Sequence, residues 1–477
     1  MLETAPGHAG SSPDRYMNRR RLALAGCAAL VIAMYLAISL QYGRSIGPVK
    51  TTGDFHNLIA DALRHGHARL LLQPPPGLAE LPDPYNATAN MPYRYAGYHD
   101  LSFYHGALYS YFGPTPALSF VLPFRILGIG DATPALGNLV FLTVGYLFLA
   151  LLYLRLASLL PRPPGLMLDC VALLLLGLAT TAPFIMHAGR AYEEAIAAGL
   201  CFVAAGAYFL ARAFTQPRHR AVWCALGSAS LGVAVGARPD DVIYSALVIV
   251  PALVVVFRRP HRLRLLLALL VPLTVCGCLL AGYNYARFHS ITEFGSYYQL
   301  AGMDMHTYAF RQAWYIPLGL YYYLLAVPRV TSSFPFIRLL ANTSNGTYST
   351  LFSYEPVAGL FVIAPVVPLG LMAFVGVGPR LVYQARLLYT AVALMALSSL
   401  LVVVFVAWQF NAATMRYELD YAPLLVLVAV LGYGYFCGLL EGRLRWAAVT
   451  LWVAAALISI AFNLATAWTP CGTTGSC

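Results

Sequence analysis

Charged residues are scarce in this chain of 477 residues, and lysine is almost absent. Charged residues make up 10% of it and hydrophobic residues 60%, with a mean hydropathy of +0.68. A soluble globular protein cannot bury so much apolar side chain, which excludes that class. Lys50 is the only lysine, so the net charge of +11 is carried by arginines, many of them beside long apolar runs. Arginines so placed indicate membrane topology and make no case for nucleic acid as a partner.

The sequence also lacks the motifs of nucleotide and metal sites. It has no glycine-rich phosphate loop, and its nine cysteines show no metal-ligand spacing. Most of the cysteines lie in apolar runs, where cysteine behaves as a small hydrophobe. Cys471 and Cys477 lie instead in a polar C-terminal tail. If that tail is outside the cell, either a short disulfide loop or two free thiols would fit the pattern.

Apolar runs of about 20 residues, the length that crosses a bilayer, recur almost to the C-terminus. The first, residues 22–40, follows a cluster of arginines and is too long for a cleaved signal peptide, which makes it a signal anchor. Further spans are predicted at 135–156, 166–187, 193–213, 221–237, 241–257, 263–284, 356–377, 387–409, 420–440 and 446–468, about eleven in all. We therefore expect an all-α polytopic membrane protein. Its predicted parts are a cytosolic tail (1–21), one transmembrane domain (22–468) and an external tail (469–477).

Basic loops set the predicted orientation. They follow every second span and share the side of the N-terminus, as at Arg155, Arg212, Arg258, Arg380 and Arg443. The positive-inside rule makes that side the cytosol. The other side holds two long segments, 43–133 and 285–355, and most of the acidic residues, which favours chemistry there. We expect a multi-pass protein of a bacterial inner (plasma) membrane with its active site outside.

The first external segment opens with TTGDFHNLIADALRHG at 51–66. Asp54 begins an amphipathic pattern, which predicts a helix along the membrane surface. Asp54 is either a simple N-cap of that helix or a functional carboxylate. A second surface element is predicted for GPTPALSFVLPFRILG at 113–128, because it is short, contains prolines and carries Arg125.

Between these elements lies YHDLSFYHGALYSYFGPTP, in which aromatic, histidine and acidic residues are interleaved. Aromatic rings beside carboxylates suit a sugar, so His99, Asp100 and Tyr104 are candidate substrate-binding residues. The alternative for the tyrosines is an aromatic belt at the membrane surface. Glu193 and Glu194 begin a span, where a buried charge is costly unless it faces a cavity, so they are further candidates for substrate binding.

The order of these features resembles the GT-C superfamily of membrane glycosyltransferases. The nearer likeness is to the branch with protein O-mannosyltransferases and aminoarabinose transferases. It rests on the "GD" of the first external segment, the two surface elements, and the segments GRAYEEAIAAGLCFVAAGAYFLARA and GVAVGARPDDVIYSALVIVP. MRYELDYAPLL resembles the ending of several members. The chain departs from the family at Arg238, where a lysine is common, and at Gly113–Pro116, where Lys-Pro-Pro is usual.

The resemblance implies a sugar donor on a polyprenyl phosphate and a glycan, lipid or protein acceptor at the external, periplasmic or lumenal, face. Asp54 matches the family's catalytic acid and is the candidate general base. Arg190, Arg238 and Arg416 are the candidate phosphate-binding residues, since guanidinium suits phosphate oxygens. Alternatively, Arg190 could pair with Glu194 and Arg238 with Asp241, and Arg416 could only anchor a span end. No fixed ligand spacing supports a divalent metal, so no metal site is assigned.

Two other functions fit a chain of this class. A transporter or flippase of lipid-linked saccharides would place ionisable residues near the bilayer midplane and show paired halves. Here the charges lie at the span ends and no internal repeat is evident. A surface-polysaccharide polymerase or ligase shares the lipid donor and differs in its acceptor, which the sequence does not distinguish.

Overall fold

The computed structural model describes residues 13–41, 46–49, 53–258, 262–308, 311–342 and 352–468. Within them, eleven helical segments are long and apolar enough to cross a membrane, which confirms the predicted class. They are formed by α1 (Pro13–Ser39), α5 (Pro134–Ala157), α6 (Leu166–Leu178) with α7 (Ala182–Ala188), α8 (Ala191–Thr215), α9 (Arg220–Ala237), η5 (Pro239–Ser245) with α10 (Ala246–Arg258), α11 (Leu263–Phe288), α14 (Val366–Gln384), α15 (Arg386–Gln409), α16 (Ala422–Leu439) and α17 (Gly442–Thr466). Cys471 and Cys477 lie outside the described residues.

Three spans differ from the sequence prediction. Helix α1 already begins at Pro13, inside the expected tail. The third span is broken between α6 and α7, where Thr181 has a left-handed φ of 60° and Pro183 lies in the first turn of the next helix. The span expected at 356–377 is α14, because the short helix α13 (Leu360–Ile363) ends before Pro365 and a new helix starts after it.

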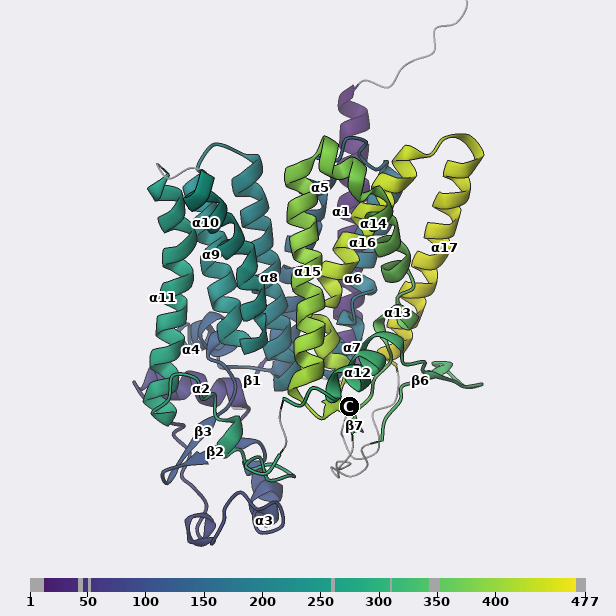
Figure 1. Cartoon of the computed structure of the whole chain (residues 1–477). Helices are drawn as coiled ribbons and strands as arrows, with labels where there is room; N and C mark the ends of the chain where they lie inside the picture. The colour runs from purple at the N-terminus through teal and green to yellow at the C-terminus, as the bar shows by residue number, and fades with distance from the viewer. Residues whose placement is uncertain are drawn as a thin grey trace, which may run out of the picture.

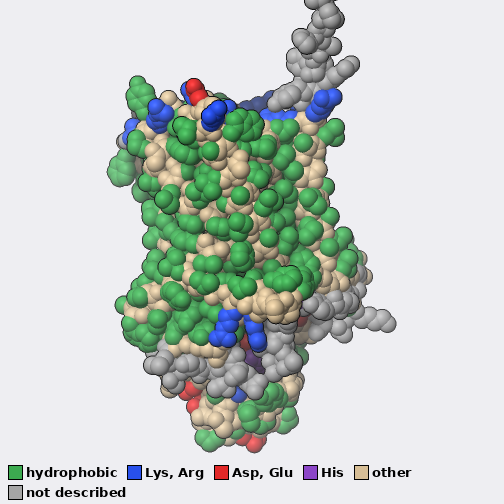
Figure 2. Space-filling model, turned by 90° about the vertical axis from the view of Figure 1, so that its right-hand side faces the viewer, with side chains coloured by type: hydrophobic (Ala, Val, Ile, Leu, Met, Phe, Trp, Pro, Cys, Tyr) green, Lys and Arg blue, Asp and Glu red, His purple; other side chains and the backbone are tan. Residues whose placement is uncertain are grey.

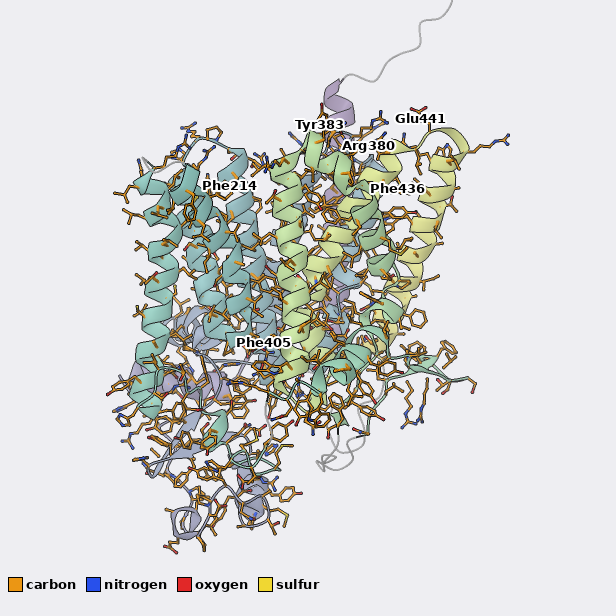
Figure 3. All side chains as sticks on the ribbon, viewed as in Figure 1. Phe214, Arg380, Tyr383, Phe405, Phe436 and Glu441 are labelled. Atoms are coloured by element: carbon orange, nitrogen blue, oxygen red, sulfur yellow. The ribbon has the colours of Figure 1, made fainter. Side chains whose placement is uncertain are left out.

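The helices stand side by side with the external segments gathered beyond one end (Figure 1). Helix α16 is apolar all round and buried along nearly its whole length, as expected of a helix at the centre of a bundle. Figure 2 shows an apolar belt with basic side chains along the edge next to the N-terminal helix. Arg380 and Tyr383 of α14 lie at that end, and Phe405 of α15 lies toward the other (Figure 3). The basic loops therefore share one end of the bundle, as predicted.

The first external segment forms the two predicted surface elements. Helix α2 (Phe55–Arg64) buries Ile59 and Ala62 on its apolar face. The second element consists of η4 (Ala117–Val121) and α4 (Leu122–Ile126), which is too short to span the membrane. Arg125 of α4 pairs with Asp61 of α2 at 2.6 Å and with Asp131 at 2.8 Å, which joins the two elements.

Short strands and helical turns complete the external end. The strand pairs are β1 (Pro48–Val49) with β4 (Asp131–Ala132), β2 (Leu101–Tyr104) with β3 (Ala107–Ser110), β5 (Arg329–Val330) with β6 (Ile337–Arg338) and β7 (Ser353–Tyr354) with β8 (Ala412–Ala413). The short helical turns are η2 (Leu78–Glu80), α3 (Met91–Tyr93), η3 (Arg94–Tyr98), η6 (Ser296–Tyr298), α12 (Tyr315–Leu320), η7 (Tyr321–Leu325) and η8 (Met415–Asp420). The two external segments are joined to each other. The Leu300 amide donates to the Leu101 carbonyl at 2.8 Å, and the Ser102 hydroxyl donates to the Gly295 carbonyl at 2.8 Å.

Candidate active site

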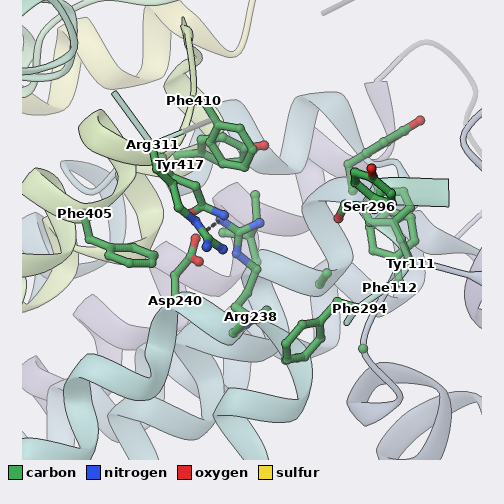
Figure 4. Close-up of a pocket in the computed structure, with 18 of the residues that line it drawn as sticks. Tyr111, Phe112, Arg238, Asp240, Phe294, Ser296, Arg311, Phe405, Phe410 and Tyr417 are labelled. Carbon is green, nitrogen blue, oxygen red and sulfur yellow. Dashed lines mark hydrogen bonds and ion pairs between the residues drawn. The ribbon is translucent and has the colours of Figure 1, made fainter. Parts of the chain in front are cut away.

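A cavity of about 730 Å³ lies where the membrane helices meet the external segments (Figure 4). Its wall is assembled from parts of the chain that are far apart in sequence. They are residues 111–113, the first turns of α8, the α9–η5 junction, residues 292–294, 296–297, 308 and 311–312, the end of α15 and the start of η8. The membrane helices contribute apolar side chains, including Ile196 and Phe405. The charged side chains come from the α9–η5 junction (Arg238, Asp240), the second external segment (Glu293, Arg311) and the start of η8 (Arg416).

Arg238 is a cation of the wall that two carboxylates hold in place. Because Pro239 follows it, Arg238 takes an extended backbone (φ −137°, ψ 114°) and ends α9. Its guanidinium donates to Asp420 at 2.8 Å and to Asp240 at 3.2 Å, and lies 4.7 Å from the centre of the Tyr417 ring. Burial alone would lower the pKa of Arg238, but the surrounding carboxylates hold it above its usual value. The local alternative considered from the sequence, pairing with Asp241, is thus replaced by Asp240 and by the distant Asp420.

Asp420 is nearly inaccessible, with 1% of its side chain exposed. Burial raises the pKa of Asp420 to about 6, although Arg238 opposes that rise. Glu418, two residues earlier in η8, is fully buried, and burial raises its pKa well above the usual value. The partner of Arg238 at Asp420 is therefore a dehydrated carboxyl, and a second one, Glu418, lies in the same turn of the chain.

Arg416 forms a second cationic part of the wall. It pairs with Glu355 at 2.9 Å, and its guanidinium lies 5.4 Å from the centre of the Tyr192 ring and 5.5 Å from that of Tyr417. Tyr192 also lines the cavity, so its ring lies between the first turn of α8 and the start of η8. Arg416 is thus paired with a carboxylate and set between two aromatic rings of the wall.

Arg311 is a cavity residue that sequence reasoning missed. Its backbone has a φ of 61°, its amide donates to the Gln409 carbonyl at 3.2 Å, and its guanidinium lies 5.9 Å from the Trp408 ring. In the described part of the chain, no carboxylate pairs with Arg311. Figure 4 shows Arg311 and Arg238 reaching into the same region beside Asp240. The sequence did contain one indication that Arg311 belongs to a site, namely its position in an external segment rich in aromatic residues.

Asp54 caps α2, which was the structural alternative for this residue. Its carboxylate accepts hydrogen bonds from the backbone amides of His56 (2.9 Å) and Asn57 (3.4 Å) and from the Asn57 side chain. Asp54 is half-buried and is not part of the cavity wall. Side chains of the wall separate Asp54 from the cavity. The ring of the adjacent residue Phe55 lies 5.0 Å, centre to centre, from the ring of Phe112, which lines the cavity.

His56 and Glu194 form a buried polar contact near Asp54. His56 Nε2 is 4.0 Å from Glu194 Oε2 and hydrogen bonds with the Ala191 carbonyl at 3.1 Å. Burial lowers the pKa of His56, partly opposed by the charge of Asp54. Glu194 fits because Gly137 of α5 has no Cβ; a Cβ there would lie 2.2 Å from Glu194 Oε1. The predicted substrate-binding residue Glu194 is thus near Asp54 and not on the cavity wall.

The other predicted residues lie around Tyr192 and behind the wall. Arg190 pairs with Glu193 at 3.1 Å, not with Glu194 as its local alternative had it, and lies 5.9 Å from the centre of the Tyr192 ring. Asp100 accepts hydrogen bonds from the Tyr192 hydroxyl and from Gln299 Nε2 (2.7 Å), so it connects the external segments to the cavity wall.

His99 and Tyr104 flank Asp100 in the first external segment. His99 is 54% exposed and lies 3.7 Å from Asp100. Tyr104 packs against Tyr298 at 4.4 Å in an aromatic cluster between the two external segments. Neither residue lines the cavity. As to a metal, the described residues contain no group of three His, Cys, Asp or Glu side chains arranged to hold an ion.

The sequence matches no protein-family model and no curated protein. Among solved structures, the chain is similar to the Archaeoglobus fulgidus oligosaccharyltransferase. The form tethered with an acceptor peptide is 12% identical, with a TM-score of 0.47 over 93% of this chain and 56% of that chain. The AglB complex with an inhibitory peptide and a dolichol-phosphate is 11% identical, with a TM-score of 0.45 over 92% of this chain and 55% of that chain.

The chain is also similar to ArnT from Cupriavidus metallidurans bound to undecaprenyl phosphate. The two are 13% identical, with a TM-score of 0.40 over 93% of this chain and 77% of that one. This chain thus spans little more than half the length of the oligosaccharyltransferase. At these TM-scores and identities the similarity is limited to the path of the backbone and carries no information about the reaction.

Proposed function

We propose that the protein is a membrane glycosyltransferase that transfers a hexosyl or pentosyl group from a polyprenyl-phosphate donor to a glycan, lipid or protein acceptor at the external face. The composition of the cavity wall supports this function. Part of the wall is apolar and comes from membrane helices, and the rest carries three arginines among aromatic side chains. A donor made of a lipid tail, a phosphate and a sugar needs these three kinds of surface in one place.

In this reaction the acceptor hydroxyl oxygen bonds to the anomeric carbon of the sugar, and the bond from that carbon to the phosphate oxygen breaks. The electron pair of the broken bond stays with the lipid phosphate, where Arg238, Arg311 and Arg416 stabilise the added charge. The hydroxyl proton passes to a carboxylate, the general base. Since Arg238 and Arg416 are already held by carboxylates, they would need little reorganisation when the donor binds.

We propose Asp54 as the general base, as the family resemblance implies. The two carboxylates on the wall itself are Asp240 and Glu293. Each is engaged elsewhere: Asp240 binds Arg238, and Glu293 accepts a hydrogen bond from the Gly295 amide at 2.6 Å. Asp54 caps a helix as well, so a test must separate its capping role from proton transfer.

Asp54→Asn makes that separation, because asparagine caps a helix about as well as aspartate but cannot take the proton. The matched control is Asp83→Asn. Asp83 is an exposed acid of the same external segment and accepts a hydrogen bond from the Tyr85 amide at 2.9 Å. Purified protein in proteoliposomes is given a panel of polyprenyl-phosphate hexoses and pentoses, and release of polyprenyl phosphate is followed by mass spectrometry.

We expect wild type and Asp83→Asn to release lipid phosphate from at least one donor of the panel. Asp54→Asn should turn over ~10²–10⁴-fold more slowly, while undecaprenyl phosphate still binds. Turnover of Asp54→Asn within about threefold of wild type would remove Asp54 as the base. Movement of lipid-linked sugar driven by an ion gradient, with no glycosidic product, would favour the transporter or flippase instead.

A further inference from the structure

A small hairpin projects from the external end of the bundle. Strands β5 and β6 pair antiparallel, with Arg329 opposite Arg338 and Val330 opposite Ile337. The connection is closed by the Thr331 amide, which donates to the Phe336 carbonyl at 2.9 Å. The hairpin contacts α17 through β6 and extends sideways from the helices (Figure 1). A two-stranded hairpin is marginally stable in water, so this one needs support from its surroundings.

The two faces of the hairpin differ in character. Residues directly opposite each other in an antiparallel pair share a face, so the arginines Arg329 and Arg338 lie on one face and Val330 and Ile337 on the other. Both arginines are exposed, and no carboxylate of the described chain pairs with them. Two like charges placed opposite each other destabilise a sheet unless an anion lies between or beside them. The basic face thus favours a negatively charged ligand.

One residue of the apolar face, Val330, and the tip of the hairpin are exposed as well. Val330 is 82% exposed, Phe334 65% and Phe336 56%, whereas Ile337 is buried. The Phe334 ring lies 6.2 Å from that of Trp468, which follows the end of α17. An indole at the end of a membrane helix marks the level of the lipid headgroups. Figure 2, which views this side of the molecule, shows basic side chains directly at the edge of the apolar belt.

We propose that the β5–β6 hairpin lies in the interface of the adjacent lipid leaflet and binds the phosphate groups of anionic phospholipids through Arg329 and Arg338. Its apolar side chains, Val330 and Phe334, enter the boundary between headgroups and acyl chains. Elements with one apolar and one basic face bind at this depth, and each arginine near an anionic surface adds to the attraction. The lipid supports the hairpin and neutralises its paired arginines. This site is separate from the cavity and independent of the proposed glycosyl transfer.

The depth of the hairpin can be measured on the full chain in nanodiscs. The native cysteines are replaced, and Val330→Cys carries a nitroxide label. Power-saturation electron paramagnetic resonance compares collisions of the label with oxygen, which enters the membrane, and with a water-soluble nickel complex. We expect oxygen collisions to dominate, and the ratio of oxygen to nickel collisions to rise severalfold when phosphatidylcholine is partly replaced by phosphatidylglycerol. Inorganic phosphate should not reproduce that rise.

The paired variant Arg329→Gln/Arg338→Gln should abolish the dependence on lipid charge. The matched control, Arg443→Gln/Arg445→Gln, removes two exposed arginines at the opposite end of the bundle and should retain it. Dominant nickel collisions, or a ratio that does not respond to phosphatidylglycerol in the wild type, would overturn the proposal. It would also be overturned if the label were shielded only when several copies share one membrane, since a second copy would then be the partner.

Discussion

Replacing Arg238 should cost both stability and donor binding, and the two losses can be separated. Arg238 is the cationic partner of Asp420 and Asp240, and both carboxylates are almost fully buried. Removing one partner of a buried ion pair leaves an uncompensated charge and costs ~3–5 kcal/mol. Because the pKa of Asp420 is already about 6, this carboxyl can take up a proton once the arginine is lost. We therefore expect Arg238→Gln to lower the free energy of unfolding by ~3 kcal/mol, the lower end of that range.

A second substitution tests the electrostatic origin of this loss. In Arg238→Gln/Asp420→Asn the deeper orphaned carboxylate is gone, so ~1–2 kcal/mol of the loss should be recovered. Donor binding should not recover, because the phosphate partner is still missing. Arg311→Gln should behave in the opposite way. Its guanidinium is exposed, so stability should change by less than ~0.5 kcal/mol, while loss of a charged hydrogen bond should weaken binding by ~10-fold or more.

Unfolding in mixed SDS micelles, followed by tryptophan fluorescence, gives the free energies. Titration with undecaprenyl phosphate, followed by native mass spectrometry, gives the affinities. If Arg238→Gln and the double variant unfold at the same free energy, orphaned charge is not the cause of the loss. If Arg311→Gln and Arg238→Gln both bind the lipid phosphate as wild type does, the assignment of this wall to the donor phosphate is refuted.

Three further outcomes are expected. Below pH 6 the carboxyl of Asp420 becomes protonated, so Arg238 keeps its pair with Asp240 but one of its two neutralising charges is lost. Affinity for the singly charged phosphodiester donor should therefore rise as pH falls from 7 to about 5, and this rise should vanish in Asp420→Asn. Gly370→Ala should destabilise the bundle by ~1–3 kcal/mol, because the added Cβ would lie 2.5–2.6 Å from α16, whereas Gly376→Ala on the same helix meets nothing within 4 Å and should be neutral or slightly stabilising. In a cysteine-free background, a membrane-impermeant thiol reagent should label Glu80→Cys in intact cells but Arg443→Cys only after lysis; the reverse pattern would contradict the orientation.

Much of the fold was predictable because each span carries its own signal, about 20 apolar residues, and each basic loop carries another. The prediction was least accurate at 356–377. There Pro365 separates α13 from α14, and hydropathy alone does not distinguish a short helix that precedes a span from the span itself. The break at Thr181 was missed for a similar reason, since a left-handed residue inside an apolar run leaves the hydropathy unchanged.

The site was less predictable, because its contacts join distant parts of the chain. Sequence reasoning identified Arg238 and Arg416, which line the cavity, but it considered only local partners for the first. The observed partner Asp420 is 182 residues away, a contact that no periodicity indicates. Arg311 was missed for the same reason, since it reaches the wall only through the end of α15. The role of Asp54 as general base remains a prediction. Its position in the sequence supports that role, whereas Asp54 does not line the cavity.

The order in which the wall is synthesised has a consequence for biogenesis. Phe112 is made early, and Tyr417, on another part of the same wall, follows roughly 300 residues later. At ~5–20 residues per second, the first external segment waits ~15–60 s for its partners. During that interval the wall has its α8 and α9–η5 parts but lacks the part from η8, so Tyr111 and Phe112 are less well covered than in the complete chain. Chains that stop before η8 should therefore insert their early helices and yet be degraded faster than the full-length protein.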